Sequence, residues 1–217
     1  MQNRQVANRG SEPAESNGAR LIDYEPPAWN GTELRMLDAA ATLIATRGID
    51  GLTVTALAKA AGVSRPTVYR SWPGVDEIVR ATLLRATVSL FERLGEPPTA
   101  RDGIADAIVR FSARFREDPL FRSLLERQPE LFTRYSLERI GSSQRFMLRW
   151  IATAVVAGQS EGSVRQGSPD DLAVMLLLIA QSATLSHRAV STVIGDLELD
   201  RQLRIAIDGY LHPERST

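Results

Sequence analysis

The sequence predicts an all-α fold, and three observations support that prediction. Apolar residues recur at spacings of three and four along most of the 217-residue chain, which places them on one face of a helix. Proline, glycine and hydroxyl or acidic residues interrupt this pattern where helices typically begin and end. No segment shows the alternation of apolar and polar residues that indicates a half-buried strand. A chain of this length, 43% hydrophobic, can bury a substantial core.

The composition restricts the chemistry available to the chain. It contains no cysteine and only two histidines, which leaves no thiolate nucleophile and no cysteine-ligated zinc, and we expect neither a metal nor a cofactor. No apolar run reaches the ~18–20 residues of a membrane span, and the N-terminus does not resemble a signal peptide. We therefore expect a cytoplasmic protein without a membrane partner.

The N-terminal residues divide into an arm and a first helix. Residues 1–30 are rich in Asn, Ser, Glu, Gly and Pro and lack an apolar period, which is typical of a disordered arm. Three arginines in this arm could contact DNA, although a solvated tail explains them as well. The first helix is expected to begin at Asn30, where Glu33 completes a capping box, and to end at Gly48.

The segment 53–72 has the pattern of a helix-turn-helix. Two short helical patterns are joined by a tight turn at Gly62, and the second begins at the capping residue Ser64 with Pro66 in its first turn. Small residues lie where the two helices must approach closely. All of its charged residues are positive, namely Lys59, Arg65 and Arg70. The segment therefore predicts a second helix with a cationic face that can enter a major groove of double-stranded DNA.

The charge distribution agrees with a DNA-binding module. The whole chain has a formal net charge of zero, but residues 31–94 carry eight basic and six acidic side chains, and residues 53–72 alone are +3. Residues 1–30 and 95–217 are each −1. A weakly basic module on a mildly acidic body suits a specific DNA binder with modest non-specific phosphate attraction.

Individual residues of the motif are assigned roles by their chemistry. Arg65 at the helix start can bond a guanine in bidentate fashion, Thr67 can meet a thymine methyl, and Tyr69 can hold a phosphate. Arg70 and Lys59 could contact DNA or simply be solvated, and we expect Val68 in the core. The DNA-contacting candidates are Thr53, Lys59, Ser64, Arg65, Thr67, Tyr69 and Arg70.

The rest of the chain predicts further helices. A fourth helix begins with Asp76 and Glu77, whose charges suit a helix N-terminus, and continues for about twenty residues to Gly95. At ~1.5 Å per residue it spans about 30 Å, enough to connect the DNA-binding module to a second domain. Further helices are expected from Thr99 (with Asp102 as a capping partner), from Asp118 to Pro129, from Leu131 to Gly162, from Ser168, and over Leu197–Leu211.

The helix that begins at Ser168 is apolar on every side between Leu172 and Ala180. A monomer could hardly cover all of these side chains, so we expect this helix and the last one to pair with the same helices of a second subunit. The predicted dimer-interface residues are Leu172, Met175, Leu178, Leu203 and Ile207.

Residues 31–94 resemble the DNA-binding domain of the tetracycline-repressor (TetR) family. The matching residues are Gly48, Thr53, Val54, Ala58, Ala61, Gly62, Val63, Ser64, Tyr69 and Trp72. The resemblance implies a homodimeric repressor on a pseudo-palindromic operator, with a fourth helix linking the DNA-binding helices to a larger helical domain. It also implies a small-molecule effector that shifts the fourth helix and releases DNA. One departure is Val75, where the family usually has a phosphate-contacting lysine; Arg80 or the arm could replace it.

The resemblance also raises the expectation of an effector cavity in the larger domain. Aromatic and aliphatic residues at helical spacing are more often core than cavity, but an apolar ligand site has the same composition. The candidates are Phe111, Phe115, Leu125, Met147, Trp150 and Gln181. His187 is a further polar candidate, for which a surface or interface position is the simpler interpretation.

The expected organisation is an arm at 1–30, a helix-turn-helix domain at 31–76 and an effector-binding and dimerisation domain at 77–217. Two alternatives stay open. The same fold could answer to a protein partner or to no effector at all. An enzyme is not expected, because the acid pairs Glu117-Asp118 and Asp170-Asp171 lie at helix starts and no nucleophile–base arrangement is present.

Overall fold

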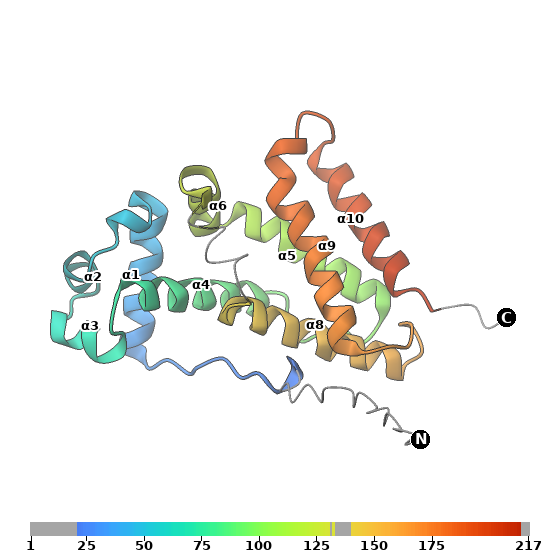
Figure 1. Cartoon of the computed structure of the whole chain (residues 1–217), viewed down its shortest axis with the longest axis horizontal. Helices are drawn as coiled ribbons and strands as arrows, with labels where there is room; N and C mark the ends of the chain where they lie inside the picture. The colour runs from blue at the N-terminus through green and yellow to red at the C-terminus, as the bar shows by residue number, and fades with distance from the viewer. Residues whose placement is uncertain (1–20, 131, 133–139, 214–217) are drawn as a thin grey trace, which may run out of the picture.

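The computed structural model describes residues 21–130, 132 and 140–213, and all regular structure within those residues is helical (Figure 1). The predicted all-α fold is confirmed. Two short helices, α2 and α3, lie at one end of the elongated molecule, and α9 and α10 lie toward the other. The helix α4 runs between these two regions.

The N-terminal helices begin and end close to the predicted residues. The side chain of Asn30 accepts hydrogen bonds from Thr32 N and Glu33 N, and the Glu33 carboxylate accepts one from the Asn30 amide. The predicted capping box is therefore confirmed. The elements are the 3₁₀ turn η1 (Leu21–Asp23), α1 (Gly31–Arg47), η2 (Ile49–Gly51), α2 (Val54–Ala61), α3 (Arg65–Ser71) and α4 (Val75–Glu92).

The remaining helices follow the predicted caps in two cases. Asp118 caps α6 by accepting from the amides of Leu120 and Phe121, and Ser168 caps α9 by accepting from Asp171 N, as expected. The elements are α5 (Arg101–Glu117), α6 (Pro119–Arg127), α8 (Ser142–Ser160), α9 (Pro169–Val190) and α10 (Asp196–Leu211).

Two predicted boundaries are wrong. The helix expected to be capped by Thr99 and Asp102 has Ala100 at its cap position, because the Asp102 carboxylate accepts from the neighbouring Gly103 amide instead. The continuous helix expected from Leu131 to Gly162 does not exist, since Ile140 and Gly141 are not helical and α8 begins at Ser142. Residues 131 and 133–139 lie outside the described residues.

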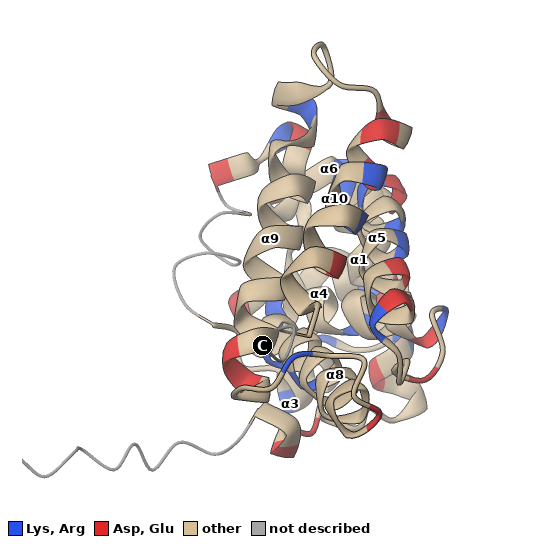
Figure 2. Ribbon diagram, turned by 90° about the vertical axis from the view of Figure 1, so that its right-hand side faces the viewer, with Lys and Arg blue, Asp and Glu red and all other residues tan. Residues whose placement is uncertain are grey.

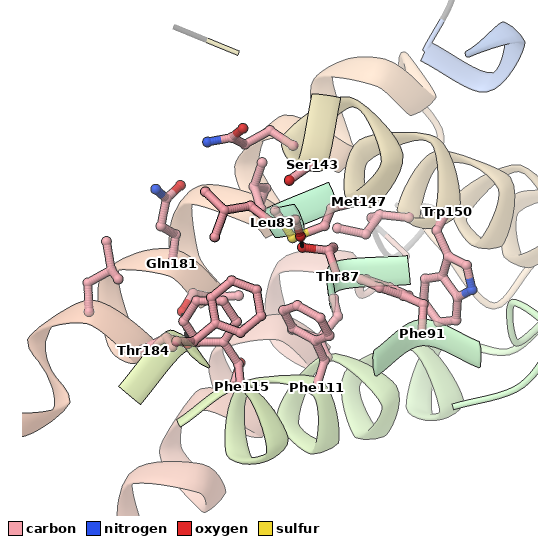
Figure 3. Close-up of a pocket in the computed structure, with 18 of the residues that line it drawn as sticks. Leu83, Thr87, Phe91, Phe111, Phe115, Ser143, Met147, Trp150, Gln181 and Thr184 are labelled. Carbon is pink, nitrogen blue, oxygen red and sulfur yellow. Dashed lines mark hydrogen bonds between the residues drawn. The ribbon is translucent and has the colours of Figure 1, made fainter. Parts of the chain in front are cut away.

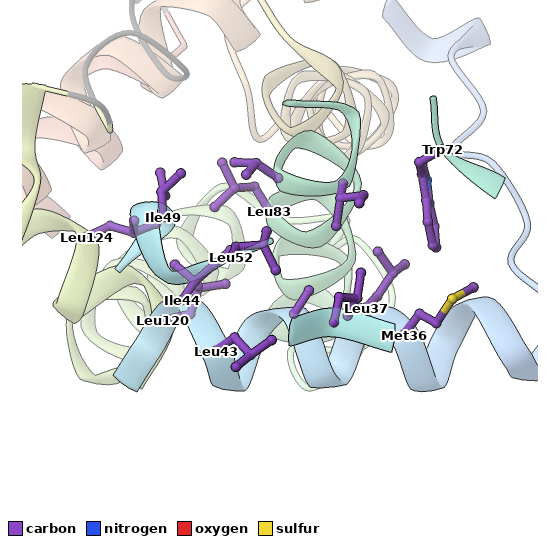
Figure 4. Close-up of a cluster of buried hydrophobic side chains, with 14 of the residues drawn as sticks. Met36, Leu37, Leu43, Ile44, Ile49, Leu52, Trp72, Leu83, Leu120 and Leu124 are labelled. Carbon is purple, nitrogen blue, oxygen red and sulfur yellow. The ribbon is translucent and has the colours of Figure 1, made fainter. Parts of the chain in front are cut away.

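Buried side chains form two hydrophobic clusters. The first core joins α1–α4 to the end of α5 and to α6, and it contains Leu120 and Leu124 of α6 together with Ile44 of α1 (Figure 4). The second core joins the end of α4 to α5, α8, α9 and α10. Because α4 supplies Leu83 to the first core and Phe91 to the second, packing is continuous across the boundary expected at residue 76.

The segment before α1 corrects the prediction of a disordered arm for residues 21–30. Leu21 and Ile22 pack against the second core, and the Leu21 amide donates to the Asp170 carboxylate at 3.3 Å. Trp29 packs against the first core. The sequence did not indicate these three packing residues, because the segment is mostly polar and its apolar residues are not spaced as in a helix or a strand. Residues 1–20 lie outside the described residues.

Salt bridges hold the last helix against α5. Arg116 and Asp200 approach to 2.8 Å, and Arg101 and Asp208 to 3.2 Å. A hydrogen bond from Arg204 holds the pKa of the Asp106 carboxyl below its ordinary value. These partly exposed pairs orient α10 more than they stabilise it, since solvent screens them.

A single glutamine clamps α6 to the helix-turn-helix module. The side-chain oxygen of Gln128 accepts a hydrogen bond from the Ile49 amide at 2.6 Å, and its side-chain nitrogen donates to the Asp50 carboxylate at 2.8 Å. The neighbouring Arg127 donates to the Thr46 carbonyl at 3.0 Å. The α1–α2 connection is therefore held by α6 and not only by the module's own packing.

We predict that Gln128→Ala lowers the free energy of unfolding by about 1–3 kcal/mol, because it leaves the Ile49 amide without its partner beside a buried side chain. Urea denaturation followed by circular dichroism measures the change. Gln166→Ala, at an exposed position, is the control. Equal stabilities of the two variants would contradict the role given to the clamp.

Candidate nucleic-acid interface and ligand cavity

The helix-turn-helix is built by a chain of local hydrogen bonds. Thr53 caps α2 by accepting from Ala56 N at 3.1 Å. At the other end of α2, Gly62 adopts a left-handed conformation (φ 66°, ψ 36°), and Val63 N donates to the Ala58 carbonyl at 3.0 Å. A residue with a side chain is strained at this φ, so the glycine permits the sharp turn.

The cap of α3 involves two of the predicted DNA-contacting residues. The Ser64 hydroxyl accepts from Thr67 N at 3.3 Å and lies 2.9 Å from the Thr67 hydroxyl. Val68 is fully buried in the first core, as predicted, and fixes the face of α3 that turns inward. The opposite face is consequently turned to solvent.

The cationic residues of the motif are free to meet a ligand. Lys59, Arg65 and Arg70 are exposed, and none makes an ion pair or side-chain hydrogen bond with the described residues. Tyr69 is 56% exposed, unusually high for a large aromatic residue. The structure thus gathers a phenol and three unpaired cations on α2 and α3, while Thr67 is half-buried.

The structure explains why a valine, and not a lysine, occupies position 75. Val75 is the first residue of α4 and packs against the first core, so an apolar side chain is useful there. The suggested substitute, Arg80, is exposed and lies 3.4 Å from Glu77. A carboxylate beside it weakens its attraction for a phosphate.

A small apolar cavity of about 90 Å³ lies between α4, α5, α8 and α9. Figure 3 shows Phe111 and Phe115 extending from α5 toward Met147 and Thr87. Five of the six predicted cavity residues line it: Phe111, Phe115, Met147, Trp150 and Gln181. Leu125 does not, because α6 turns it toward the first core. The fourth helix was also expected to touch the cavity with its half Leu83–Leu94, and Leu83, Thr87 and Phe91 of α4, which share one face at a spacing of four, do line it.

Aromatic rings form a continuous row along this cavity. Phe91 lies 5.1 Å from Trp150 and 4.6 Å from Phe111, measured between ring centroids. Phe111 lies 5.9 Å from Phe115, whose ring stacks on Phe121 at 4.1 Å. The row therefore leads from the second core into the first.

Six polar side chains of the described residues line the cavity, and three of them, Thr87, Gln144 and Thr184, are hydrogen-bonded within the protein. Thr87 donates to the Leu83 carbonyl at 2.8 Å, and Thr184 donates to the Ala180 carbonyl at 2.7 Å. The buried hydroxyl of Ser112 has no partner. None of the described residues that line the cavity is charged. The sequence interpretation missed Ser112, because a serine beside Phe111 carries no signal of its own.

The outer face of α9 is apolar and uncovered, and Ile205 of α10 adds to it. Met175, Leu178 and Ile205 are 41%, 51% and 52% exposed. Figure 2 shows α9 free of charged residues between its acidic start and its basic last turn. By length and hydropathy α9 meets the criteria for a membrane span, which core helices of soluble proteins also meet, and 22% of its most apolar window is buried in the protomer.

Three of the predicted dimer-interface residues are instead buried within the protomer. Leu172, Leu203 and Ile207 are 3%, 4% and 0% exposed, because α9 and α10 turn them inward onto the second core. They present almost no surface to another subunit. His187, the remaining polar candidate, lies 2.8 Å from Asp196 and connects the end of α9 to the start of α10, outside the cavity.

Comparisons with known proteins agree with this geometry. Residues 36–82 match the family described as bacterial regulatory proteins, tetR family. An uncharacterised helix-turn-helix transcriptional regulator of Mycobacterium tuberculosis is 36% identical over 177 residues, which cover 82% of this chain and 93% of the relative.

Two ligand-bound crystal structures share the fold. FadR of Bacillus subtilis, in complex with stearoyl-CoA, superposes with a TM-score of 0.58 at 16% identity, covering 82% of this chain and 99% of FadR. RolR in complex with resorcinol superposes with a TM-score of 0.57 at 16% identity, covering 83% of this chain and 87% of RolR.

Proposed function

Since the chain belongs to the tetR family of bacterial regulatory proteins, we propose that it is a sequence-specific DNA-binding transcriptional regulator. We further propose that it is a cytoplasmic repressor that a small, largely apolar effector releases from a pseudo-palindromic operator. The observation that carries the proposal is the solvent-facing side of α3, where Arg65, Tyr69 and Arg70 stand exposed above a rigid cap and the buried Val68.

The readout follows from where these side chains stand. Arg65 is the first residue of α3, the end that a recognition helix directs at base edges. Tyr69 lies four residues further on the same face, where its hydroxyl can hold a phosphate. Lys59 on α2 supplies a second backbone contact. Phosphate contacts set the register, whereas Arg65 reads the sequence.

A second copy of the chain covers the apolar face of α9 and α10 in this proposal. Met175 and Leu178 on α9 and Ile205 on α10 would meet their equivalents in a four-helix interface. An open groove between the two helices, lined by Leu178, Ala183 and Ala206 among others, gives that partner a surface to fill. A two-fold dimer would then present two α3 helices to two half-sites.

The effector would act through α4. Leu83, Thr87 and Phe91 of this helix line the cavity, and its first turns hold Ile78 and Val79 in the first core. An effector that binds the DNA-free conformation more tightly would shift the equilibrium, whereas equal affinity for both conformations would shift nothing. The ligands of FadR and RolR differ so widely that the shared fold does not determine the ligand.

A regulator without a small-molecule effector, or one that answers to a protein partner, is the alternative. The small size of the cavity favours it, because about 90 Å³ is less than the ~150 Å³ of an engineered cavity that holds benzene. Ligand-dependent loss of operator binding separates the two proposals. A cavity that accepts no compound would support the alternative.

We predict that Arg65→Ala weakens operator binding by about 1–3 kcal/mol and weakens binding to an unrelated duplex much less. Fluorescence anisotropy with both duplexes at one salt concentration measures the two affinities. Arg122→Ala, which removes the same charge from an exposed position on α6, should leave both unchanged. Equal losses on the two duplexes would remove the base-reading role from Arg65.

We predict that Leu178→Glu converts the protein to a folded monomer of about 23.9 kDa, because it places a charge in the proposed apolar interface. Light scattering at micromolar concentration and circular dichroism report mass and folding. Leu203→Glu should instead unfold the chain, since that side chain is buried in the protomer. Ile140→Glu, at a position 53% exposed and outside α9 and α10, should stay dimeric. A monomeric unmodified protein would refute the proposed interface.

We predict that Ala107→Leu abolishes effector response while operator affinity stays within about threefold. Ala107 lines the cavity and is 2% exposed, so three added carbons occupy the void. Anisotropy of a labelled operator, titrated with neutral apolar compounds that release the unmodified protein, measures the response. Ala113→Leu, on the same helix but outside the cavity, should respond normally. An unchanged response of Ala107→Leu would place the effector elsewhere.

A further inference from the structure

The hydroxyl of Ser112 is one of two exceptions among the buried hydroxyls of the described helices. Thr82, Thr87 and Thr184 each donate to the carbonyl four residues earlier, at 2.7–2.8 Å. This is the usual way in which a hydroxyl inside a helix is satisfied. Ser112 is 0% exposed, and its Oγ has no partner among the described residues. An unpaired buried hydroxyl costs stability, so a partner there would be favourable.

The position of Ser112 connects this unpaired group to the cavity. Ser112 lines the cavity on α5, beside Phe111 and one turn before Phe115. Ser123 is the only other serine among the described residues with a buried, unpaired Oγ, but it lies on α6 and does not line the cavity. An unpaired hydroxyl alone is therefore not a site; at Ser112 it coincides with an empty space bounded by aromatic rings.

The walls of the cavity define the charge of an occupant. The described lining residues include no Asp, Glu, Lys, Arg or His, and their Thr87 and Thr184 hydroxyls are already bonded to the backbone. A charged ligand would lose its hydration without gaining an opposite charge. The occupant is thus neutral.

The size and shape of the cavity define the carbon framework of a ligand. A volume of about 90 Å³ corresponds to roughly three water molecules, so the cavity must widen slightly to admit a ring the size of benzene. Met147 lines the half-exposed side and is flexible enough to move. Phe91 is in contact with Phe111 and with Trp150, at 4.6 and 5.1 Å between ring centroids, so the three rings form one aromatic wall against which another flat ring can pack.

We propose that the effector is a neutral, single-ring aromatic compound bearing a hydroxyl or carbonyl group that hydrogen-bonds to Ser112 Oγ. The inference rests on the proposed function, because it names the ligand class of that same cavity. Ser112 is the specificity-determining residue: it distinguishes a hydroxylated ring from a plain hydrocarbon of the same size. Gln181, half-exposed on α9, is placed to meet a second polar substituent.

The test compares three probes of similar size, namely phenol, toluene and benzoate, by isothermal titration calorimetry on the full chain. We expect phenol to bind more tightly than toluene and benzoate not to bind. Ser112→Ala should weaken phenol binding about 3- to 10-fold, the size of one hydrogen bond, and leave toluene unchanged. Ser123→Ala, which removes the other unpaired serine hydroxyl, should alter neither affinity.

Further readouts keep the outcomes separate. Ser112→Ala should fold with an equal or higher melting temperature, since it removes an unsatisfied buried group. The proposal is overturned if no probe binds at millimolar concentration, if benzoate binds best, or if Ser112→Ala weakens toluene and phenol equally. Operator anisotropy is measured separately. Phenol binding through Ser112 without operator release would uphold the ligand class and refute the effector mechanism.

Discussion

The rest of the structure depends on the packing of α4 between two hydrophobic cores. Its first turns bury Ile78 and Val79 among the DNA-binding helices, and its last turn buries Phe91 against Trp150 and Phe111. Packed interiors do not deform continuously, so a side chain that moves at one end of a shared helix requires an adjustment at the other. This constraint makes a cavity in the second half of the molecule relevant to the position of α3.

A second connection runs beside α4 through α6. Leu120 and Leu124 of α6 belong to the same core as α1, and Gln128 holds the amide of Ile49 before α2. Phe121, on the same short helix, lines the cavity. Part of the cavity wall and the support of the helix-turn-helix are thus supplied by one nine-residue helix and its C-cap residue Gln128, and the two connections constrain the module together.

Charge and apolar surface are separated along the molecule. The three unpaired cations of the helix-turn-helix lie on α2 and α3, the cavity is lined by uncharged described residues, and the exposed apolar side chains concentrate on α9, α10 and the loop between them. Each surface suits one type of contact: phosphate, a neutral ring, or a second apolar face. The overall composition and the net charge of zero are averages over the whole chain, so they do not indicate any of these three surfaces.

Local chemistry determined much of this protein from the sequence. The caps at Asn30, Thr53, Ser64, Asp118 and Ser168 lie where the sequence predicts them, because a capping hydrogen bond joins residues two or three apart. The left-handed turn at Gly62 follows from a single residue type for the same reason. Five of the six cavity candidates line the cavity; Phe111 and Phe115 do so because their spacing of four places them on one face of α5.

Only the tertiary structure decided which face of each helix turns inward. Leu172, Leu203 and Ile207 carry the same chemistry as Met175 and Leu178, yet three are buried in the protomer and two are exposed. For the same reason Leu125 was wrongly assigned to the cavity and Ser112 was overlooked. Sequence spacing shows which residues share a face of one helix, but not which neighbouring helix that face meets. Burial depends on contacts between residues far apart in the chain, and no local pattern contains them.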